Sequence, residues 1–187
     1  MAINRVPVIE TQRLVLRAFT AADAHAVQRL AGDPVVAATT LVIPHPYTDG
    51  LAERWIATHA TQARKGGIFV FAICLRATAE LIGSIGVHVN KRDNNASIGY
   101  WIGKPYWNLS YCTEAATAVV GFGFNTLGLN KMHAFIASIN PASGRVLEKL
   151  GMLREGHRPA HIRKADQYYD TDDYGMLRGD YLERLSK

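Results

Sequence analysis

The chain has 187 residues, of which 48% are hydrophobic, and carries a formal net charge of +5. This length and apolar content support one well-filled core and are short for two, so a single domain over residues 1–187 is expected. Lys and Arg are scattered without a run of five or more, which argues against a nucleic-acid-binding arm.

The first third of the chain predicts a strand and two helices. Residues 12–19 alternate apolar and charged side chains, as a half-buried strand does. A helix follows over residues 21–32, and its last residue, Gly32, suits a left-handed C-terminal cap. Two prolines predict a loop over residues 39–50, and a second helix is expected over residues 51–65.

The middle of the chain predicts three strands and a helix. Buried-looking runs cover residues 68–76 and 81–90, and a further strand covers residues 96–103 after a polar turn. A helix is expected over residues 111–127, because small and apolar residues recur on one face, and Gly128 stops it.

The last third predicts a strand over residues 131–138, a short helix over residues 141–151 and two final alternating strands. No repeat or low-complexity segment interrupts this order. The element order therefore belongs to the α/β class.

The cysteines and histidines do not form a metal-binding pattern. Cys74 and Cys112 lie in regular segments without CxxC or Cys/His spacing, so both are interpreted as reduced, packed thiols. The seven histidines are dispersed, and no metal is predicted. The first residues lack a signal-peptide hydrophobic region and no apolar run approaches a spanning helix, so a cytoplasmic protein without a membrane partner is expected.

The segment from Ser97 to Ala118 runs from strand to turn to helix. Asn108, Ser110 and Cys112, which are small or turn-forming, precede or open the helix, where several backbone N–H groups lack partners. Such a helix start can bind a pyrophosphate through backbone donors alone. The alternative is a capped helix without a ligand.

A second segment joins a strand to a helix at Asn140 and Pro141. As structure, Asn140 is the N-cap of the helix and Ser143 an ordinary residue at its third position. As chemistry, Asn140 offers an amide and Ser143 a hydroxyl at the mouth between two strands.

Several ordered motifs together resemble one family. They lie at Thr11–Phe19, Ile43–Thr48, Ile82–Val87, Ile98–Trp107, Tyr111–Ala116, Asn140–Met152 and Asp173–Tyr174. Over nearly the whole chain the sequence resembles a GCN5-related N-acetyltransferase (GNAT), of the RimJ/RimL-like branch that acetylates ribosomal-protein N-termini and related amines.

The resemblance implies an α/β (α+β) fold with a mixed, mostly antiparallel sheet of about seven strands and helices on both faces. Two central strands, residues 97–103 and 131–138, would splay apart. The pantetheine arm of acetyl-CoA would lie between them, and its pyrophosphate would meet the turn before the central helix. The implied cofactor-binding residues are Trp101, Ile102, Gly103, Trp107, Asn108, Leu109, Ser110, Tyr111, Cys112, Thr113, Asn140 and Ser143.

The pyrophosphate turn departs from the family pattern W-G-K-G-Y-A. Asn108 and Ser110 replace glycines, and Leu109 replaces a basic residue, which predicts weaker cofactor affinity. Asn tolerates a left-handed conformation, so Asn108 can hold the turn. Ser110 could either crowd the phosphate or donate an additional hydrogen bond. The backbone donors are unaffected by these changes.

The catalytic residues are less clearly marked than the cofactor site. The resemblance implies a backbone N–H from residues 101–103 for the oxyanion, and we expect Ser143 to protonate the departing thiolate. The acidic residue often found in the family is Ser97 here. His161, Glu155 and His88 are candidate bases, with His161 preferred, although a surface histidine is an equal alternative. Glu114, just inside the helix, is interpreted as structural.

The acceptor is expected to be an amine of low pKa, since no strong base is evident. An α-amine, with a pKa of about 7.8, has a far larger neutral fraction than a lysine amine near 10.4. Residues 44–47 and 155–170 would border the acceptor. A protein N-terminus is thus one acceptor and a small amine another. The alternatives are a non-catalytic acyl-CoA-binding protein and a ribosome-associated protein; a homodimer is left open.

Overall fold

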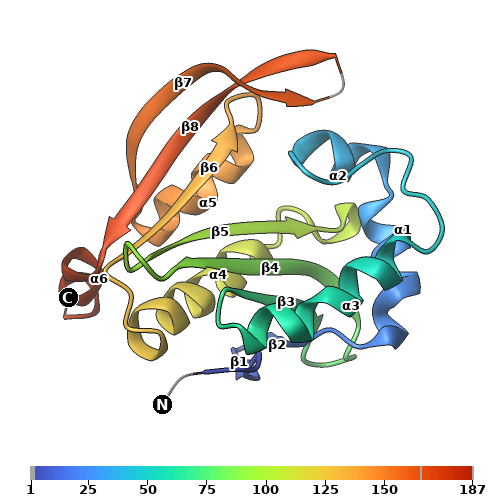
Figure 1. Cartoon of the computed structure of the whole chain (residues 1–187), viewed down its shortest axis with the longest axis horizontal. Coiled ribbons are helices and arrows are strands. Elements are labelled where there is room, and N and C mark those ends of the chain that lie inside the picture. The colour runs from blue at the N-terminus through green and yellow to red at the C-terminus, as the bar shows by residue number, and fades with distance from the viewer. Residues whose placement is uncertain (1–2, 165, 187) are drawn as a thin grey trace.

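The computed structural model describes residues 3–164 and 166–186, which build one eight-stranded sheet. Its strands lie in the order β1-β2-β3-β4-β5-β6-β8-β7 (Figure 1). Every neighbouring pair is antiparallel except β5 and β6, which run parallel. The mixed, mostly antiparallel sheet is confirmed, with eight strands instead of about seven.

The N-terminal half begins with a strand of two residues, which is too short to show an alternation pattern and was not predicted. Its elements are β1 (Ile9–Glu10), β2 (Leu14–Ala18), the 3-10 turn η1 (Ala21–Asp23), α1 (Ala24–Ala31), α2 (Pro34–Thr39), α3 (Leu51–Arg64), β3 (Ile68–Leu75), β4 (Leu81–Asn90) and β5 (Asn95–Ile102).

The C-terminal half follows a short connection and ends on a helix. Its elements are the 3-10 turn η2 (Lys104–Tyr106), α4 (Tyr111–Gly121), the π-helical turn η3 (Phe122–Thr126), β6 (Lys131–Ala137), α5 (Pro141–Leu150), β7 (Leu153–Lys164), β8 (Gln167–Leu177) and α6 (Arg178–Leu185).

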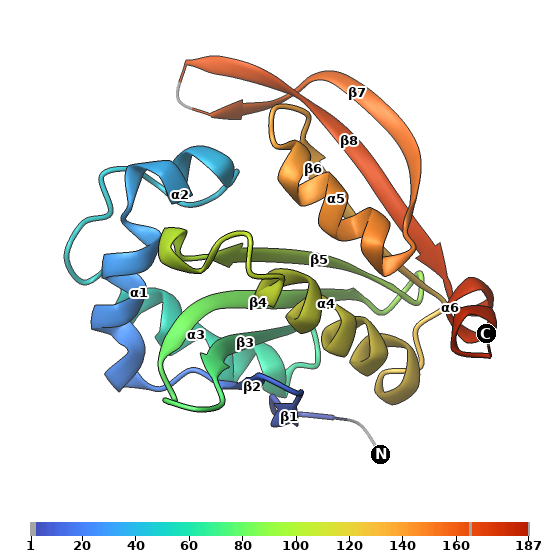
Figure 2. The same cartoon turned by 180° about the vertical axis from the view of Figure 1, so that it is seen from behind.

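Helices cover both faces of the sheet, as expected. In Figure 1 α3 lies in front of the central strands, whereas Figure 2 shows α4 and α5 on the opposite face. The main core lies under α4 and α5 and includes Phe71, Ile85, Val119 and Leu147, all fully buried. On the α3 side, the described helices leave β6 accessible, and Phe135 is exposed there.

The parallel strands β5 and β6 pair over only three residues. Asn95 pairs with Lys131, Ala96 with Met132 and Ser97 with His133, after which the ladder stops. We call the unpaired stretch beyond this point, residues 98–102 of β5 and 134–137 of β6, the splay. The predicted separation of the two central strands is therefore confirmed.

Two helix-end predictions were wrong. Gly32 has a φ of −74°, so it is right-handed, because the chain turns directly into α2. There Asp33 caps the new helix by accepting a hydrogen bond from Val35 N (2.8 Å). The predicted helix over residues 111–127 is α-helical only to Gly121 and then widens into η3.

Gly123 in η3 packs closely against β6. A Cβ placed there would lie 2.2 Å from Met132 Sδ, so this position has room only for glycine. Gly128 does adopt the predicted left-handed conformation, with a φ of 69°. Helix α6 was not predicted, because its eight residues are mostly polar and none is buried.

Candidate active site

The turn before α4 contains two residues in the left-handed region. Asn108 has a φ of 60° and Ser110 a φ of 62°, so the expectation for Asn108 is confirmed and Ser110 shares it. A non-glycine residue in this region costs about 1–2 kcal/mol. The turn therefore keeps the backbone shape that two glycines would give, at some cost in stability.

Helix α4 opens toward this turn with unpaired donors. The first N–H with a helical acceptor is that of Glu114, which donates to Ser110 O (3.0 Å). The preceding amides of Tyr111, Cys112 and Thr113 thus belong to the open first turn, where the positive end of the helix dipole adds to them. Backbone groups at this point can bind an anion without a charged side chain.

Glu114 of α4 and Arg13, the residue directly before β2, hold the turn in place. The Glu114 carboxylate accepts hydrogen bonds from Thr11 Oγ1 (2.6 Å), Arg13 N (2.8 Å) and Arg13 Nε (2.7 Å). Arg13 also donates to Leu109 O (3.1 Å) and stacks on the Tyr111 ring at 4.5 Å. Glu114 is therefore structural, as predicted, but it anchors β2 rather than capping its own helix.

The backbone of β5 has donors that face the splay. Gly103 N donates to Ile82 O (2.8 Å) and so is directed toward β4. Because neighbouring residues of an antiparallel strand point their amides in opposite directions, the N–H groups of Tyr100 and Ile102 face the splay instead. Within residues 101–103, the N–H group of Ile102 is therefore the candidate oxyanion donor. The N–H group of Tyr100 is a second candidate.

Asn140 acts as the predicted N-cap of α5. Its side-chain oxygen accepts from Ser143 N (3.2 Å), and its Nδ2 donates to Thr39 O of α2 (2.9 Å). Both ends of the amide are engaged within the protein. The structural interpretation of Asn140 is thus confirmed, and its side chain also ties α5 to α2.

Ser143 contacts a side chain whose role the sequence did not predict. Tyr100 Oη lies 3.0 Å from Ser143 Oγ and donates to Ser143 O at 3.1 Å, so the two side chains join β5 to α5 beside the splay. Burial raises the pKa of Tyr100 above its usual value and that of the nearby Cys112 to about 12. The Tyr100 hydroxyl and the Cys112 thiol are thus protonated at neutral pH. Tyr100 lies within the motif at Ile98–Trp107, but nothing in the sequence gave it a role.

The proposed bases fall in different places. His161 is exposed on β7, with Nε2 2.6 Å from Arg158 Nη1. Glu155 accepts two hydrogen bonds of 2.7 Å from Lys131 Nζ. His88 pairs with Ser97 across β4 and β5.

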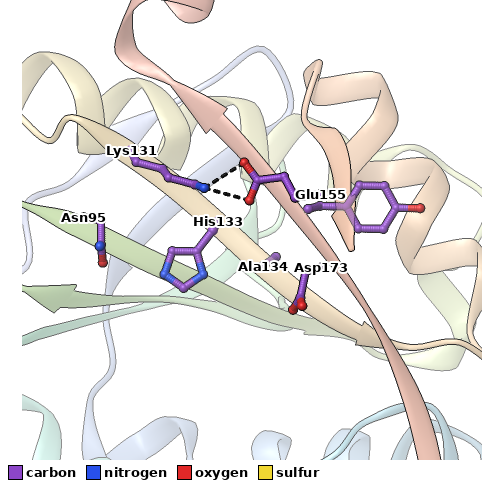
Figure 3. Close-up of a pocket in the computed structure, with 7 residues that line it drawn as sticks. Asn95, Lys131, His133, Ala134, Glu155 and Asp173 are labelled. Atoms are coloured by element: carbon purple, nitrogen blue, oxygen red, sulfur yellow. Dashed lines mark hydrogen bonds and ion pairs between the residues drawn. The ribbon is translucent and has the colours of Figure 1, made fainter. Parts of the chain in front are cut away.

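A pocket of about 310 Å³ opens on the α3 side at the closed end of the splay (Figure 3). Its lining residues come from four strands: Asn95, Lys131, His133, Ala134, Glu155, Asp173 and Tyr174. Within it, Lys131 pairs with Glu155, as the dashed lines in Figure 3 show. The sequence did not mark His133 as a site residue, because its strand shows an apolar alternation in which one histidine is ordinary.

A second pocket, of about 210 Å³, lies at the open end of the splay, where α2 meets the β7–β8 hairpin. Lys164 Nζ donates to Thr40 O (2.6 Å) and to Ala37 O, which satisfies carbonyl groups at the C-terminal end of α2. The hairpin reaches across to α2 in both views (Figures 1 and 2). Part of the segment expected to border the acceptor, residues 155–170, thus lies at this end; residue 165 is outside the described residues.

In the described part of the chain, no helix combines the length and the apolar character needed to cross a membrane.

Comparisons with known proteins place the chain among acetyltransferases. A family model described as an acetyltransferase (GNAT) domain matches residues 13–153. The uncharacterized N-acetyltransferase YoaA of Bacillus subtilis (strain 168) is 32% identical over 174 residues, covering 92% of this chain and 97% of that protein.

Two solved structures are similar in both fold and sequence. A GNAT-family acetyltransferase from Bacillus anthracis has a TM-score of 0.83 and 26% identity, covering 92% of this chain and 99% of that one. A structure from Vibrio cholerae described as "a putative ribosomal-protein-serine acetyltransferase" has a TM-score of 0.75 and 26% identity, covering 91% and 97% of the two chains.

Proposed function

Because this chain belongs to the GNAT acetyltransferase family and is an acetyl-CoA-dependent N-acetyltransferase, we propose how it binds its cofactor and which amine it acetylates. The pyrophosphate of acetyl-CoA binds at the turn before α4, and the pantetheine arm lies in the splay between β5 and β6. The acceptor is the α-amine of a protein N-terminus, which approaches from the α3 side of the sheet.

The observation that carries this proposal is the alignment of three features along one strand. Strand β5 leads from the Tyr100–Ser143 pair, past backbone donors that face the splay, to the open first turn of α4. An extended thioester with an anionic end fits such a line, because its anion meets the helix start while its thioester lies beside the hydroxyls.

The reaction needs one bond to form and one to break. The amine nitrogen attacks the thioester carbonyl carbon, a splay-facing amide of β5 stabilises the oxyanion, and the carbon–sulfur bond then breaks. The thiolate takes a proton from the Ser143 hydroxyl, which is in turn replenished from Tyr100 or solvent. Both hydroxyls are protonated at neutral pH and so can give this proton.

Two observations favour an α-amine over a lysine amine. Ser97 of β5 stands where the family often has an acidic residue, and it offers no carboxylate to remove a proton from a strongly basic amine. An α-amine with a pKa near 7.8 needs such a base less, because it is partly neutral at pH 7.4. In addition, the similar Vibrio cholerae structure is described as an acetyltransferase of a ribosomal-protein serine.

The test is a competition between acceptors. The protein is given acetyl-CoA with a short peptide that has a free N-terminal serine, with the same peptide blocked at its N-terminus but carrying a lysine, and with spermidine. We expect kcat/KM for the free N-terminus to exceed that for the blocked peptide at least about tenfold, from the larger neutral fraction alone.

Calorimetry with acetyl-CoA separates the two parts of the proposal. Binding together with preferred acetylation of lysine or spermidine would overturn the acceptor, while leaving the cofactor site in place. Lack of binding at millimolar acetyl-CoA would overturn the cofactor site itself.

A further inference from the structure

We propose that His133 is the general base of the reaction, accepting the proton that the acceptor amine loses on the α3 side of the splay. This inference rests on the proposed cofactor site, because it assumes that the thioester carbonyl lies in the splay. It identifies a residue on β6 instead of the histidine on β7 that the sequence favoured.

The first observation is the position of His133 at the point where the strands separate. Ser97 and His133 are the last pair of the parallel ladder. Beyond them the strands no longer contact each other through hydrogen bonds, so His133 is at the edge of the opening through which an acceptor and a thioester would meet. His161, by contrast, is exposed on the outer strand β7 and bonded to Arg158.

The second observation is the face on which the ring lies. Directly paired residues share a face of the sheet, so His88, Ser97 and His133 form a row across β4, β5 and β6. The neighbours of His133 along its strand, Met132 and Ala134, are buried in the core under α4 and α5. The imidazole therefore projects to the opposite side, into the pocket shown in Figure 3.

The third observation is that the charged neighbours of His133 are already paired. Lys131 donates to Glu155, and Arg158 pairs with Asp173. The His133 ring makes no hydrogen bond to any residue within 3–164 or 166–186. Its nitrogens are thus available to an incoming amine or a bridging water, whereas the carboxylates beside it are occupied by cations.

The same surroundings keep the imidazole neutral. Burial lowers the pKa of His133 below 6.5, and the positive charges of Lys131 and Arg158 act in the same direction, against the opposite pull of Glu155 and Asp173. Of the other pocket-lining residues, Asn95 does not titrate, and burial raises the pKa of Tyr174, so its hydroxyl is uncharged at pH 7. At pH 7 the ring is therefore in the form that accepts a proton.

The acid and the base then lie on opposite faces of the sheet. Tyr100 reaches Ser143 on the α5 side, whereas His133 projects to the α3 side. As the nitrogen–carbon bond forms, the amine proton passes to an imidazole nitrogen. As the carbon–sulfur bond breaks, the Ser143 hydroxyl protonates sulfur. The proton on His133 is then lost to solvent through the open pocket, and Ser143 regains a proton from solvent, directly or through Tyr100, so the enzyme returns to its starting state.

The experiment compares pH profiles of kcat/KM for the parent protein and for His133→Ala, His133→Gln and His25→Ala. The acceptor is the peptide with a free N-terminal serine, or the panel amine with the highest turnover if that peptide is inactive. His25→Ala is the matched control, because His25 is an exposed histidine on α1 that lines neither pocket.

Two deprotonations are needed in the parent, that of the amine and that of His133. As the pH falls below the pKa of His133, which is lower than 6.5, the slope of log kcat/KM against pH should therefore approach two. In both His133 variants the slope should stay at one, and kcat should fall about 100-fold, with acetyl-CoA affinity unchanged. His25→Ala should keep the parental profile.

Either of two results would overturn the proposal. One is a slope of two that survives in His133→Gln, or a kcat within about threefold of the parent. The other is a parallel loss of acetyl-CoA affinity and kcat, which would make His133 a binding or structural residue. If His133→Ala does not fold, the proposal is still tested by His133→Gln and by the slope of log kcat/KM against pH in the parent protein. Absence of acetyl-CoA binding by the parent would instead count against the proposed function.

Discussion

Tyr100 and Ser143 share one hydroxyl-to-hydroxyl contact, and this contact determines how each can serve as an acid. Ser143 is held by its place in the first turn of α5, where its N–H donates to the Asn140 side chain. Tyr100 lies on β5 and donates a hydrogen bond to Ser143 O. A serine alone is a poor acid, but a serine that can draw a proton from a buried tyrosine can protonate a thiolate without forming a free alkoxide.

We predict that Ser143→Ala and Tyr100→Phe each lower kcat about 10- to 100-fold, because each removes a link in one proton-transfer chain. Acetyl-CoA affinity should change by less than about threefold, since the anion site is at the other end of the cofactor. The double variant should lose much less than the product of the two single losses, because the residues act as a unit. Steady-state kinetics and calorimetry on the four proteins measure both effects.

Tyr106→Phe is the matched control for the tyrosine. Tyr106 Oη donates to Glu80, outside the splay. The Tyr106→Phe variant should therefore have the parental kcat. Multiplicative losses in the double variant would contradict a shared proton path and assign separate roles to Tyr100 and Ser143.

At the scale of elements, the sequence predicts what is local and misses what depends on distant partners. Strand β4 spans the predicted residues 81–90, because its apolar run and flanking turns are complete in themselves. The anchoring of the α4 turn joins Arg13 to Glu114, about a hundred positions along the chain, and no local pattern reports such a contact. For the same reason Ser143 could be proposed from its motif, whereas the roles proposed for Tyr100 and His133 depend on neighbours on other elements.

Glu114→Gln should show what that anchoring contributes. Burial acts to raise the pKa of Glu114, but hydrogen bonds from Thr11 and Arg13 outweigh it and hold the pKa below 4.5. The carboxylate thus stabilises the fold above the pKa it has in the unfolded chain, and this contribution is lost as the pH falls through the folded pKa. At pH 7 the variant should lose about 1.5–3 kcal/mol of its free energy of unfolding, the usual value of a hydrogen bond to a charged group.

The measurement is urea unfolding of the two proteins between pH 3 and 7, with calorimetry of acetyl-CoA at pH 7. The stability difference should shrink toward zero as the pH falls below about 4, and acetyl-CoA should bind about fivefold more weakly, a difference of about 1 kcal/mol. Glu53→Gln is the control, because Glu53 also lies in the first turn of a helix but is exposed. A difference that persists unchanged at pH 3 would argue against the carboxylate as the stabilising group.

At the scale of the whole molecule, the sheet is divided at the splay into a part with β1–β5 and a part with β6–β8. The two parts are joined by the short β5–β6 ladder, by the Tyr100–Ser143 contact, by the bonds from Lys164 and Asn140 to the end of α2, and by the packing of α4 against α5. Between these points the strands have no ladder, so ligand contacts there can couple two parts that the backbone leaves separate.

Acetyl-CoA in the proposed position contacts both parts, and its binding should therefore stabilise both. At a ligand concentration of 100 times Kd, stabilisation is about 2.7 kcal/mol, which corresponds to a rise in Tm of about 5–10 °C for a protein of this size. Hydrogen exchange should slow at the start of α4, within residues 109–113, and also in β6 and the first turn of α5, beyond the splay. Ser110→Pro serves as the control, because proline cannot adopt the φ of 62° found there, so it should abolish the slowing in both regions. Slowing confined to α4, with β6 and α5 unchanged, would mean that the cofactor binds only at the helix start and does not enter the splay.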